Sequence, residues 1–210
     1  MTDTGENWYD RVYAAETDEE TAAAYAGWAA TYEADLYEAG YRGPPLAAAL
    51  LARYAPEGTD PVLDAAAGTG MVGDLIGLLG FENITGIDLS DEMLKVAAGK
   101  GVYSELRTMR LGDDLDFADD RFAATLIVGA LTPGHAPASC LYELVRVTRP
   151  GGPVIFSVRV DNGSDAPFRP VIEDLEGRGQ WRFAEQTPEM TMMPLSEPDK
   201  CHRVCVYVVS

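Results

Sequence analysis

Short apolar runs alternate with stretches of helical spacing through the middle of the chain. Apolar residues at 61–63 give way to a pattern of three- and four-residue spacings at 71–79, and the same change recurs further on. Strands are predicted at 61–63, 83–88, within 103–111, at 125–129 and at 154–160, and helices at 46–54, 71–79, from 90 and at 138–147. Strand–helix alternation of this kind predicts a parallel sheet covered by helices.

The alternation ends after Asp161. Ile172 and Leu175 predict one more helix, 181–183 a strand, 187–201 a loop and 204–209 a last strand. Five parallel strands would therefore be followed by a helix and a terminal hairpin of strands.

An aromatic pattern precedes the first strand. The acidic segment 17–20 predicts a helix start capped by Thr17 or Asp18. Beyond it, Tyr25, Trp28, Tyr32 and Leu36 follow helical spacing and predict one aromatic face on a helix over 22–36. Ordinary packing into the core is one interpretation of that face.

A glycine-rich turn joins the first strand to its helix. Gly68, Gly70 and Gly73 match the G-x-G-x-x-G spacing of dinucleotide sites, and Asp88 lies twenty residues after Gly68. Asp64 argues against a dinucleotide, because a carboxylate beside a helix N-terminus would repel a pyrophosphate. It would suit a cationic ligand such as S-adenosylmethionine (SAM). A packing turn without ligand is the third interpretation.

The pattern D-x-x-x-G-x-G, from Asp64 to Gly70, resembles the first motif of the class I SAM-dependent methyltransferases. One departure is Ala66, where that family usually has glycine, so a methyl group narrows the loop. Further motifs follow in the family's order, and together they resemble the Williams–Beuren syndrome methyltransferase-like proteins: Y-x-x-W-A-x-x-Y at 25–32, G-I-D-L-S-D-E-M-L-K at 86–95, L-I-V-G-A-L at 126–131 and E-L-V-R-V-T-R-P-G-G at 143–152.

This resemblance implies an α/β three-layer sandwich with a seven-stranded, mostly parallel, Rossmann-like sheet. Residues 1–210 would form a single domain, in which 1–55 make an N-terminal helical lid, 56–160 the SAM-binding core and 161–210 a C-terminal helix and strand hairpin.

The resemblance also implies a set of cofactor contacts. Asp88 would accept the ribose hydroxyls, although a helix-start charge is the alternative, and Asp113 or Asp114 would read the adenine amino group. Leu89, Met93 and Leu115 would pack on the adenine, and Arg42 could meet the SAM carboxylate. The expected cofactor site comprises Trp28, Tyr32, Tyr41, Arg42, Asp64, Ala66, Gly68, Thr69, Gly70, Asp88, Leu89, Met93, Asp113, Asp114, Leu115 and Gly129.

The acceptor side is expected at the ends of the later strands. His135 is the candidate general base, needed only if the acceptor must lose a proton, and a surface histidine is the alternative. Leu131 would contact the acceptor, and Arg159 would hold an anionic group or form an ion pair. Three activities remain open: methyl transfer to a small molecule, SAM binding without catalysis, or dinucleotide-dependent reduction.

The net charge and the cysteine content limit the partners and ligands that we expect. The net charge is −18, and residues 1–120 carry 7 basic and 24 acidic side chains, so we expect no binding to DNA or RNA. Cys140, Cys201 and Cys205 form no disulfide framework, and Cys201-His202 with Cys205 is a weak metal pattern, so no metal is expected. With neither a signal peptide nor a membrane span in the pattern, we expect a cytoplasmic monomer or homodimer with a small-molecule substrate.

Overall fold

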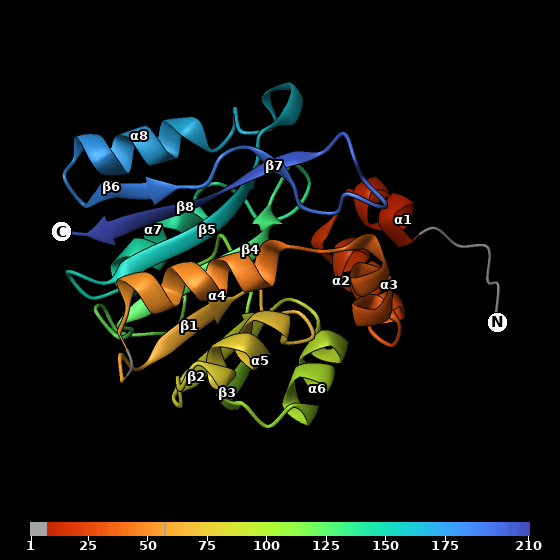
Figure 1. Cartoon of the computed structure of the whole chain (residues 1–210), viewed down its shortest axis with the longest axis horizontal. Helices are drawn as coiled ribbons and strands as arrows, with labels where there is room; N and C mark the ends of the chain where they lie inside the picture. The colour runs from red at the N-terminus through yellow and green to blue at the C-terminus, as the bar shows by residue number, and fades with distance from the viewer. Residues whose placement is uncertain (1–7, 57) are drawn as a thin grey trace.

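In the computed structural model, which describes residues 8–56 and 58–210, seven strands form one sheet in the order β3-β2-β1-β4-β5-β8-β6 (Figure 1). The strands are β1 (Val62–Ala65), β2 (Ile84–Asp88), β3 (Tyr103–Thr108), β4 (Ala124–Leu131), β5 (Pro153–Arg159), β6 (Trp181–Gln186) and β8 (Cys201–Val209). Strand β8 runs antiparallel to both β5 and β6, and the pairs among β1, β2, β3, β4 and β5 are parallel. The predicted seven-stranded, mostly parallel sheet with a terminal hairpin is confirmed.

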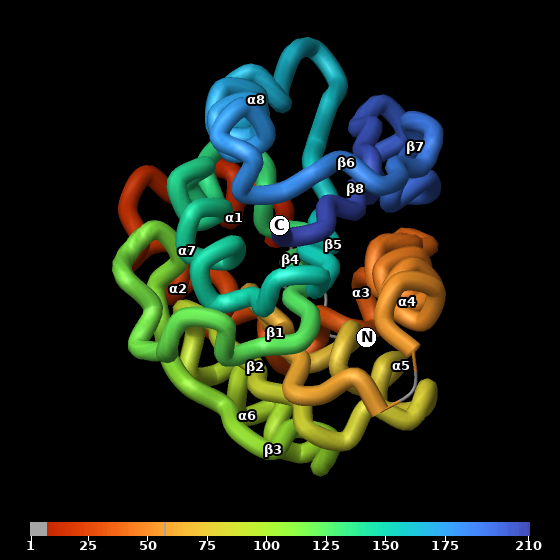
Figure 2. Tube along the Cα trace, turned by 90° about the vertical axis from the view of Figure 1, so that its left-hand side faces the viewer, coloured from red at the N-terminus to blue at the C-terminus, as the bar shows by residue number. Residues whose placement is uncertain are grey.

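Helices cover both faces of this sheet (Figure 2). One face carries α4 (Gly43–Tyr54) and α5 (Met71–Leu78), and the other carries α7 (Cys140–Val147) and α8 (Arg169–Gly177). Helix α6 (Asp91–Gly99) packs on β2 and β3. All four residues of β1 are buried, because both faces of a central parallel strand lie under helices.

Three helices gather at the carboxyl ends of the parallel strands: α1 (Trp8–Ala14), α2 (Asp18–Trp28) and α3 (Tyr32–Ala39) (Figure 1). We call them the N-terminal helices. Helix α1 was not predicted, because its apolar signal is short, and Val12 is its one buried residue. Thr17 is the cap of α2, where its hydroxyl accepts from Glu20 N–H in a capping box.

The prediction of one helix over 22–36 is wrong, because the chain breaks between α2 and α3. Trp28 Nε1 donates to Asp35 Oδ2 over 2.6 Å, and Thr31 Oγ1 donates to the same oxygen over 3.0 Å. In a continuous helix, residues 28 and 35 would lie about 10 Å apart along the axis. The turn therefore interrupts the helix, and the Asp35 carboxylate accepts two side-chain hydrogen bonds across it.

Two other predicted boundaries differ from the structure. The third strand ends at Thr108 rather than near Leu111, and its last bond to β2 is from Met109 N–H to the carbonyl of Asp88. The predicted loop 187–201 contains a two-residue strand, β7 (Met190–Thr191), which pairs with β8. No helix within the described part of the chain is long and apolar enough to cross a membrane.

The turn after β1 takes three residues into left-handed backbone conformations. Ala66 has φ 63°, Gly68 φ 56° and Gly70 φ 87°. Glycine adopts this region freely, whereas a residue with a Cβ is strained there by roughly 1–2 kcal/mol. The position where the resembling family has glycine is therefore a strained alanine.

We predict that Ala66→Gly raises the free energy of unfolding by up to about 1 kcal/mol, because the strain relieved exceeds the added flexibility of the unfolded chain. Ala67→Gly is the control, since Ala67 is not among the residues with positive φ, and it should destabilise. Chemical denaturation of both variants checks this. A loss of stability in Ala66→Gly as large as that in Ala67→Gly would contradict the strain.

Candidate cofactor and acceptor site

The carboxylate of Asp88 holds the glycine loop at the edge of the sheet. Its Oδ2 accepts the N–H of Gly68 over 2.8 Å, and its Oδ1 accepts the N–H of Ser90 over 2.9 Å. Ser90 in turn caps α6 by accepting from Met93 N–H, as predicted. Burial raises the pKa of Asp88, and the backbone donors oppose that rise. One side chain therefore fixes both the loop after β1 and the start of the helix after β2.

A cleft lies between the N-terminal helices and the carboxyl ends of the strands. An added Cβ at Gly68 would meet nothing within 4 Å, so the loop faces open space. The cleft is lined by Asp18, Thr21, Ala22, Tyr25, Tyr32, Ala66, Gly68, Asp88, Leu89, Ser90, Met93, Met109, Arg110, Leu111, Val128, Gly129, Ala130, His135, Ala136 and Pro137. Apolar walls at one end and a buried carboxylate at the loop suit a flat base and a ribose.

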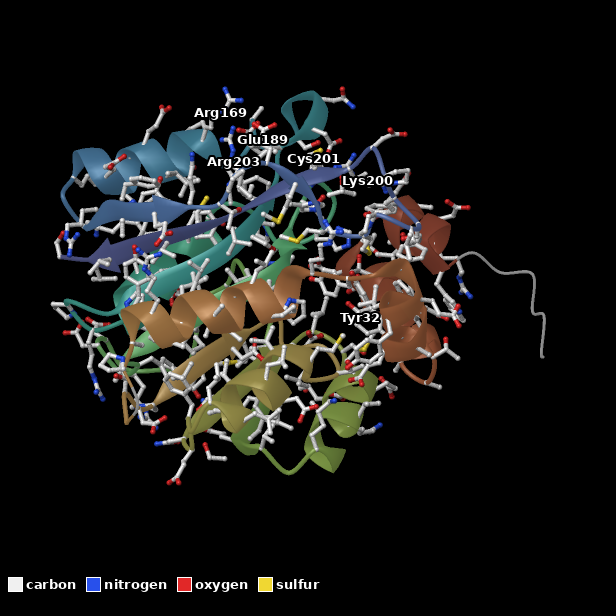
Figure 3. The ribbon with its side chains drawn as sticks, viewed as in Figure 1. Tyr32, Arg169, Glu189, Lys200, Cys201 and Arg203 are labelled. Atoms are coloured by element: carbon white, nitrogen blue, oxygen red, sulfur yellow. The ribbon has the colours of Figure 1, made fainter. Side chains whose placement is uncertain are left out.

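Eight of the predicted site residues line this cleft: Tyr32, Ala66, Gly68, Asp88, Leu89, Met93, Gly129 and His135. Figure 3 shows Tyr32 on the side where the N-terminal helices meet the sheet. The structure brings these residues together from six separate segments, while their individual roles stay predictions.

Other predicted residues lie behind the cleft or away from it. Thr69 and Gly70 are buried under the loop, Arg42 is exposed, and Leu131 is buried at the end of β4. Arg159 donates to Asp161 over 2.8 and 2.7 Å, which is the ion pair considered as its alternative role. Trp28 and Tyr41 line a second cavity beside the cleft.

The segment after β3 differs most from the expectation. Asp113 and Asp114 are exposed and Leu115 is buried in the core, so none of the three lines the cleft. Met109, Arg110 and Leu111 line it instead, because the strand ends early and the chain turns inward there. Residues 109–111, rather than the predicted 113–115, are therefore the part of this segment that lines the cleft.

Arg110 also makes a contact that sequence reasoning missed. Its guanidinium forms an ion pair with Asp18 at the start of α2, and both side chains line the cleft. A second ion pair joins Lys100, after α6, to Glu33 of α3 over 3.0 Å. The two pairs tie the N-terminal helices to the sheet across the cleft. Partners so far apart in the chain leave no local sequence signal.

Asp64 lies behind the glycine loop rather than on the cleft wall. It is fully buried, and its Oδ2 accepts from the Tyr103 hydroxyl over 2.7 Å. Its Oδ1 has no hydrogen-bond partner within the described residues. Burial raises the pKa of Asp64 to about 7, against the lowering effect of Tyr103. Its predicted attraction for a cation would therefore act through the loop, and only in the ionised form.

His135 meets Tyr25 at the inner end of the cleft. His135 Nε2 lies 3.0 Å from the Tyr25 hydroxyl oxygen, which joins the loop after β4 to α2. Burial lowers the pKa of His135, so the imidazole is neutral at pH 7, and burial raises the pKa of Tyr25. Tyr25 was part of the predicted aromatic face, but it was not assigned to the site.

Gly129 is where a side chain would block the site. It has φ 79°, and its N–H donates to Ser157 Oγ over 2.7 Å. An added Cβ would lie 2.7 Å from the Tyr41 hydroxyl oxygen. A side chain at position 129 would be strained by the positive φ and would displace the Tyr41 hydroxyl.

The strand order, the glycine loop after β1 and the acid at the end of β2 together define a Rossmann-like cofactor site of the methyltransferase kind. Comparison with known proteins agrees with this class. Residues 63–156 match the family described as "Methyltransferase domain". Over these residues the chain is similar to the methyltransferase domain family, whose methyl donor is SAM.

Two named methyltransferases are similar to the chain in sequence, and one solved structure is similar to it in fold. The chain is 36% identical to human methyltransferase-like protein 27 over 75% of this chain and 66% of that protein. It is also 36% identical to a demethylmenaquinone methyltransferase of Renibacterium salmoninarum, over 54% of this chain and 46% of that protein. The chain thus spans less than two thirds of the length of either relative. The solved structure of the [4+2]-cyclase SpnF covers 93% of this chain with a TM-score of 0.69 at 15% identity, which shows the fold alone.

Asp88→Ala is predicted to weaken SAM binding about ten- to a thousandfold, because each hydrogen bond to a charged group contributes about 1.5–3 kcal/mol. The variant should also lose about 1–3 kcal/mol of stability, since two buried N–H groups lose their acceptor. Ser90→Ala is the control: removing the helix cap should cost about 0.5–2 kcal/mol of stability and leave SAM affinity within about threefold. Calorimetry and melting curves measure both, and equal affinity in the two variants would reject the ribose role.

Asp64→Asn should remove a pH dependence of stability from the ligand-free protein. The folded pKa of Asp64 is about 7, above the unfolded value of about 3.9. Its contribution is therefore fully present below pH 4 and is lost as the pH rises through 7. The difference in free energy of unfolding, wild type minus Asp64→Asn, should fall by up to about 1.4 kcal/mol per pH unit between pH 5 and 7. A difference in free energy of unfolding that stays constant with pH would show that the pKa of Asp64 is not raised.

Proposed function

We propose that this protein transfers a methyl group from SAM to a small-molecule acceptor. The observation that carries the proposal is the junction between two cavities. The cofactor cleft and the second cavity share Tyr25, Tyr32, Gly129 and His135. A donor held in the first and an acceptor in the second would meet at these residues.

The residues of the cleft fit the cofactor. Asp88 would hold the ribose hydroxyls, and Leu89, Met93, Met109 and Leu111 would enclose the adenine. The loop at Ala66 and Gly68 would lie against the rest of the cofactor. Thr69 Oγ1 is buried and has no partner within the described residues, so it could donate into this loop.

When bound, SAM supplies a methyl group on a sulfonium sulfur, which passes to the acceptor and leaves S-adenosylhomocysteine. The chain's own task is to orient the acceptor, exclude water and remove a proton where the acceptor has one. Neutral His135 can accept that proton. If its Nε2–H donates to Tyr25, its Nδ1 is the basic nitrogen, and this atom is buried without a partner in the described chain.

The experiment is a turnover assay with SAM and a panel of small acceptors, which detects S-adenosylhomocysteine. Turnover on at least one acceptor supports the proposal, and kcat/KM should fall as the pH drops below the lowered pKa of His135. His135→Gln should reduce kcat by about a hundredfold or more, with SAM affinity nearly unchanged. SAM binding without turnover on any acceptor would favour the alternative, a SAM-binding protein without catalysis.

The N-terminal helices should act as a lid. The contacts that hold them include Asp18–Arg110, Glu33–Lys100 and Tyr25–His135, and excluding water aids methyl transfer. We predict that SAM slows amide hydrogen exchange in α2 and α3 by about tenfold or more. Helix α8, on the far part of the sheet, is the internal control and should not change. Equal protection of α2 and α3 with and without SAM would contradict the lid role.

A further inference from the structure

The second cavity has the features of a built acceptor site. Its walls come from all three N-terminal helices, from the ends of β4 and β5, and from β8. It is lined by Tyr9, Val12, Tyr13, Tyr25, Trp28, Tyr32, Leu36, Tyr41, Gly129, Thr132, His135, Ser157, Met192, Met193 and His202. Tyr41, after α3, and Met192 and Met193, between β7 and β8, complete the walls.

The walls of this cavity carry no formal charge. Within the described parts of the chain, 8–56 and 58–210, no Asp, Glu, Lys or Arg lines it. Burial lowers the pKa of both His135 and His202, so their rings are neutral at pH 7. In a protein with a net charge of −18, an uncharged cavity is a distinct local property. An ionic acceptor would be desolvated here without a counter-ion, which is strongly unfavourable.

Two nearby basic groups, Arg159 and Lys200, are already paired. Arg159 is held by both oxygens of Asp161. Lys200 forms an ion pair with Glu197, and its Nζ lies 3.6 Å from the centroid of the Tyr13 ring. Figure 3 shows Lys200 beside Cys201, on the side where the chain passes near the N-terminal helices. Neither cation is available to an anionic acceptor without breaking its ion pair.

Six of the fifteen residues that line this cavity are Tyr or Trp. Trp28 lies edge-on to Tyr32, with ring centroids 4.7 Å apart and planes at 78°, and edge-on to Tyr9 at 4.9 Å and 73°. A cluster of this kind offers both ring faces and ring edges to a flat guest. Met192 and Met193 add polarizable sulfur, which also packs well on aromatic rings.

Two polar atoms in the wall lack partners. Thr132 is only 7% exposed, and neither its Oγ1 nor His202 Nδ1 has a hydrogen-bond partner in the described part of the chain. Unpaired buried polar groups are unfavourable, so a guest that bonds to them gains affinity. These two polar atoms therefore favour a ligand that carries a hydrogen-bonding group on a flat apolar body.

We propose that the acceptor is a small, uncharged aromatic alcohol, bound in the second cavity, with its reacting hydroxyl at the junction beside His135. The oxygen–methyl bond forms as the sulfur–methyl bond breaks, and the hydroxyl proton passes to His135 and then to solvent. A second polar group on the ring would reach Thr132 and His202. This proposal rests on the proposed function, because it places the methyl donor in the adjoining cleft.

The test uses 2-naphthol as the probe and 2-naphthoate as its charged counterpart, titrated by calorimetry with and without S-adenosylhomocysteine. Because the walls are uncharged, 2-naphthol should bind about tenfold or more tightly than 2-naphthoate. Thr132→Val should weaken 2-naphthol binding about two- to tenfold, because it removes one hydrogen-bonding group at constant shape. Val12→Phe, which adds bulk to the cavity from α1, should abolish 2-naphthol binding.

Thr59→Val is the matched control, in the loop before β1 at the opposite end of the sheet, and should change nothing. Unchanged affinity for S-adenosylhomocysteine in all three variants shows that they remain folded. Equal binding of 2-naphthoate, or no effect of Thr132→Val and Val12→Phe, would overturn the acceptor proposal alone. Failure of the wild type to bind S-adenosylhomocysteine would instead overturn the proposed function, while the titrations of 2-naphthol without it still test the cavity.

Discussion

The pocket depends on the hydrogen bond between the Asp88 carboxylate and the N–H of Gly68. The chain leaves β1 through left-handed conformations at 66, 68 and 70, which an unsupported loop would rarely keep together. Asp88 holds the middle of that loop from the neighbouring strand, and Ala67 N–H bonds the carbonyl of Ile87 just before it. These two hydrogen bonds therefore hold the loop after β1 against the end of β2, and this loop forms one wall of the cleft.

The N-terminal helices complete both cavities, and long-range polar contacts hold them in place. Asp18 and Glu33 reach the core through Arg110 and Lys100, and Tyr25 reaches His135. The same aromatic side chains that cover the cofactor cleft also form the second cavity. Binding in either cavity would then favour the closed position of the helices, which couples donor and acceptor without a direct contact between them.

Local patterns allowed much of the core to be predicted. The strand–loop–helix around Gly68, the cap at Ser90 and the acid at Asp88 all depend on neighbours within a few residues, so the chain itself carries their signal. The break between α2 and α3 depends on Asp35 collecting donors from Trp28 and Thr31, which outweighs the helical spacing of the aromatic residues. The inward turn at 109–111 involves Asp18, 92 residues away. The requirement for glycine at position 129 is set by Tyr41, which the fold alone brings there.

The most direct measurement of the central claim is calorimetric titration of the full chain with SAM and, separately, with NAD. The glycine loop is compatible by spacing with either ligand, but the fold, the family and the buried Asp64 behind the loop favour SAM. The account predicts saturable binding of SAM at one site per chain and no heat from NAD beyond dilution. Saturable binding of NAD with a silent SAM titration would contradict it.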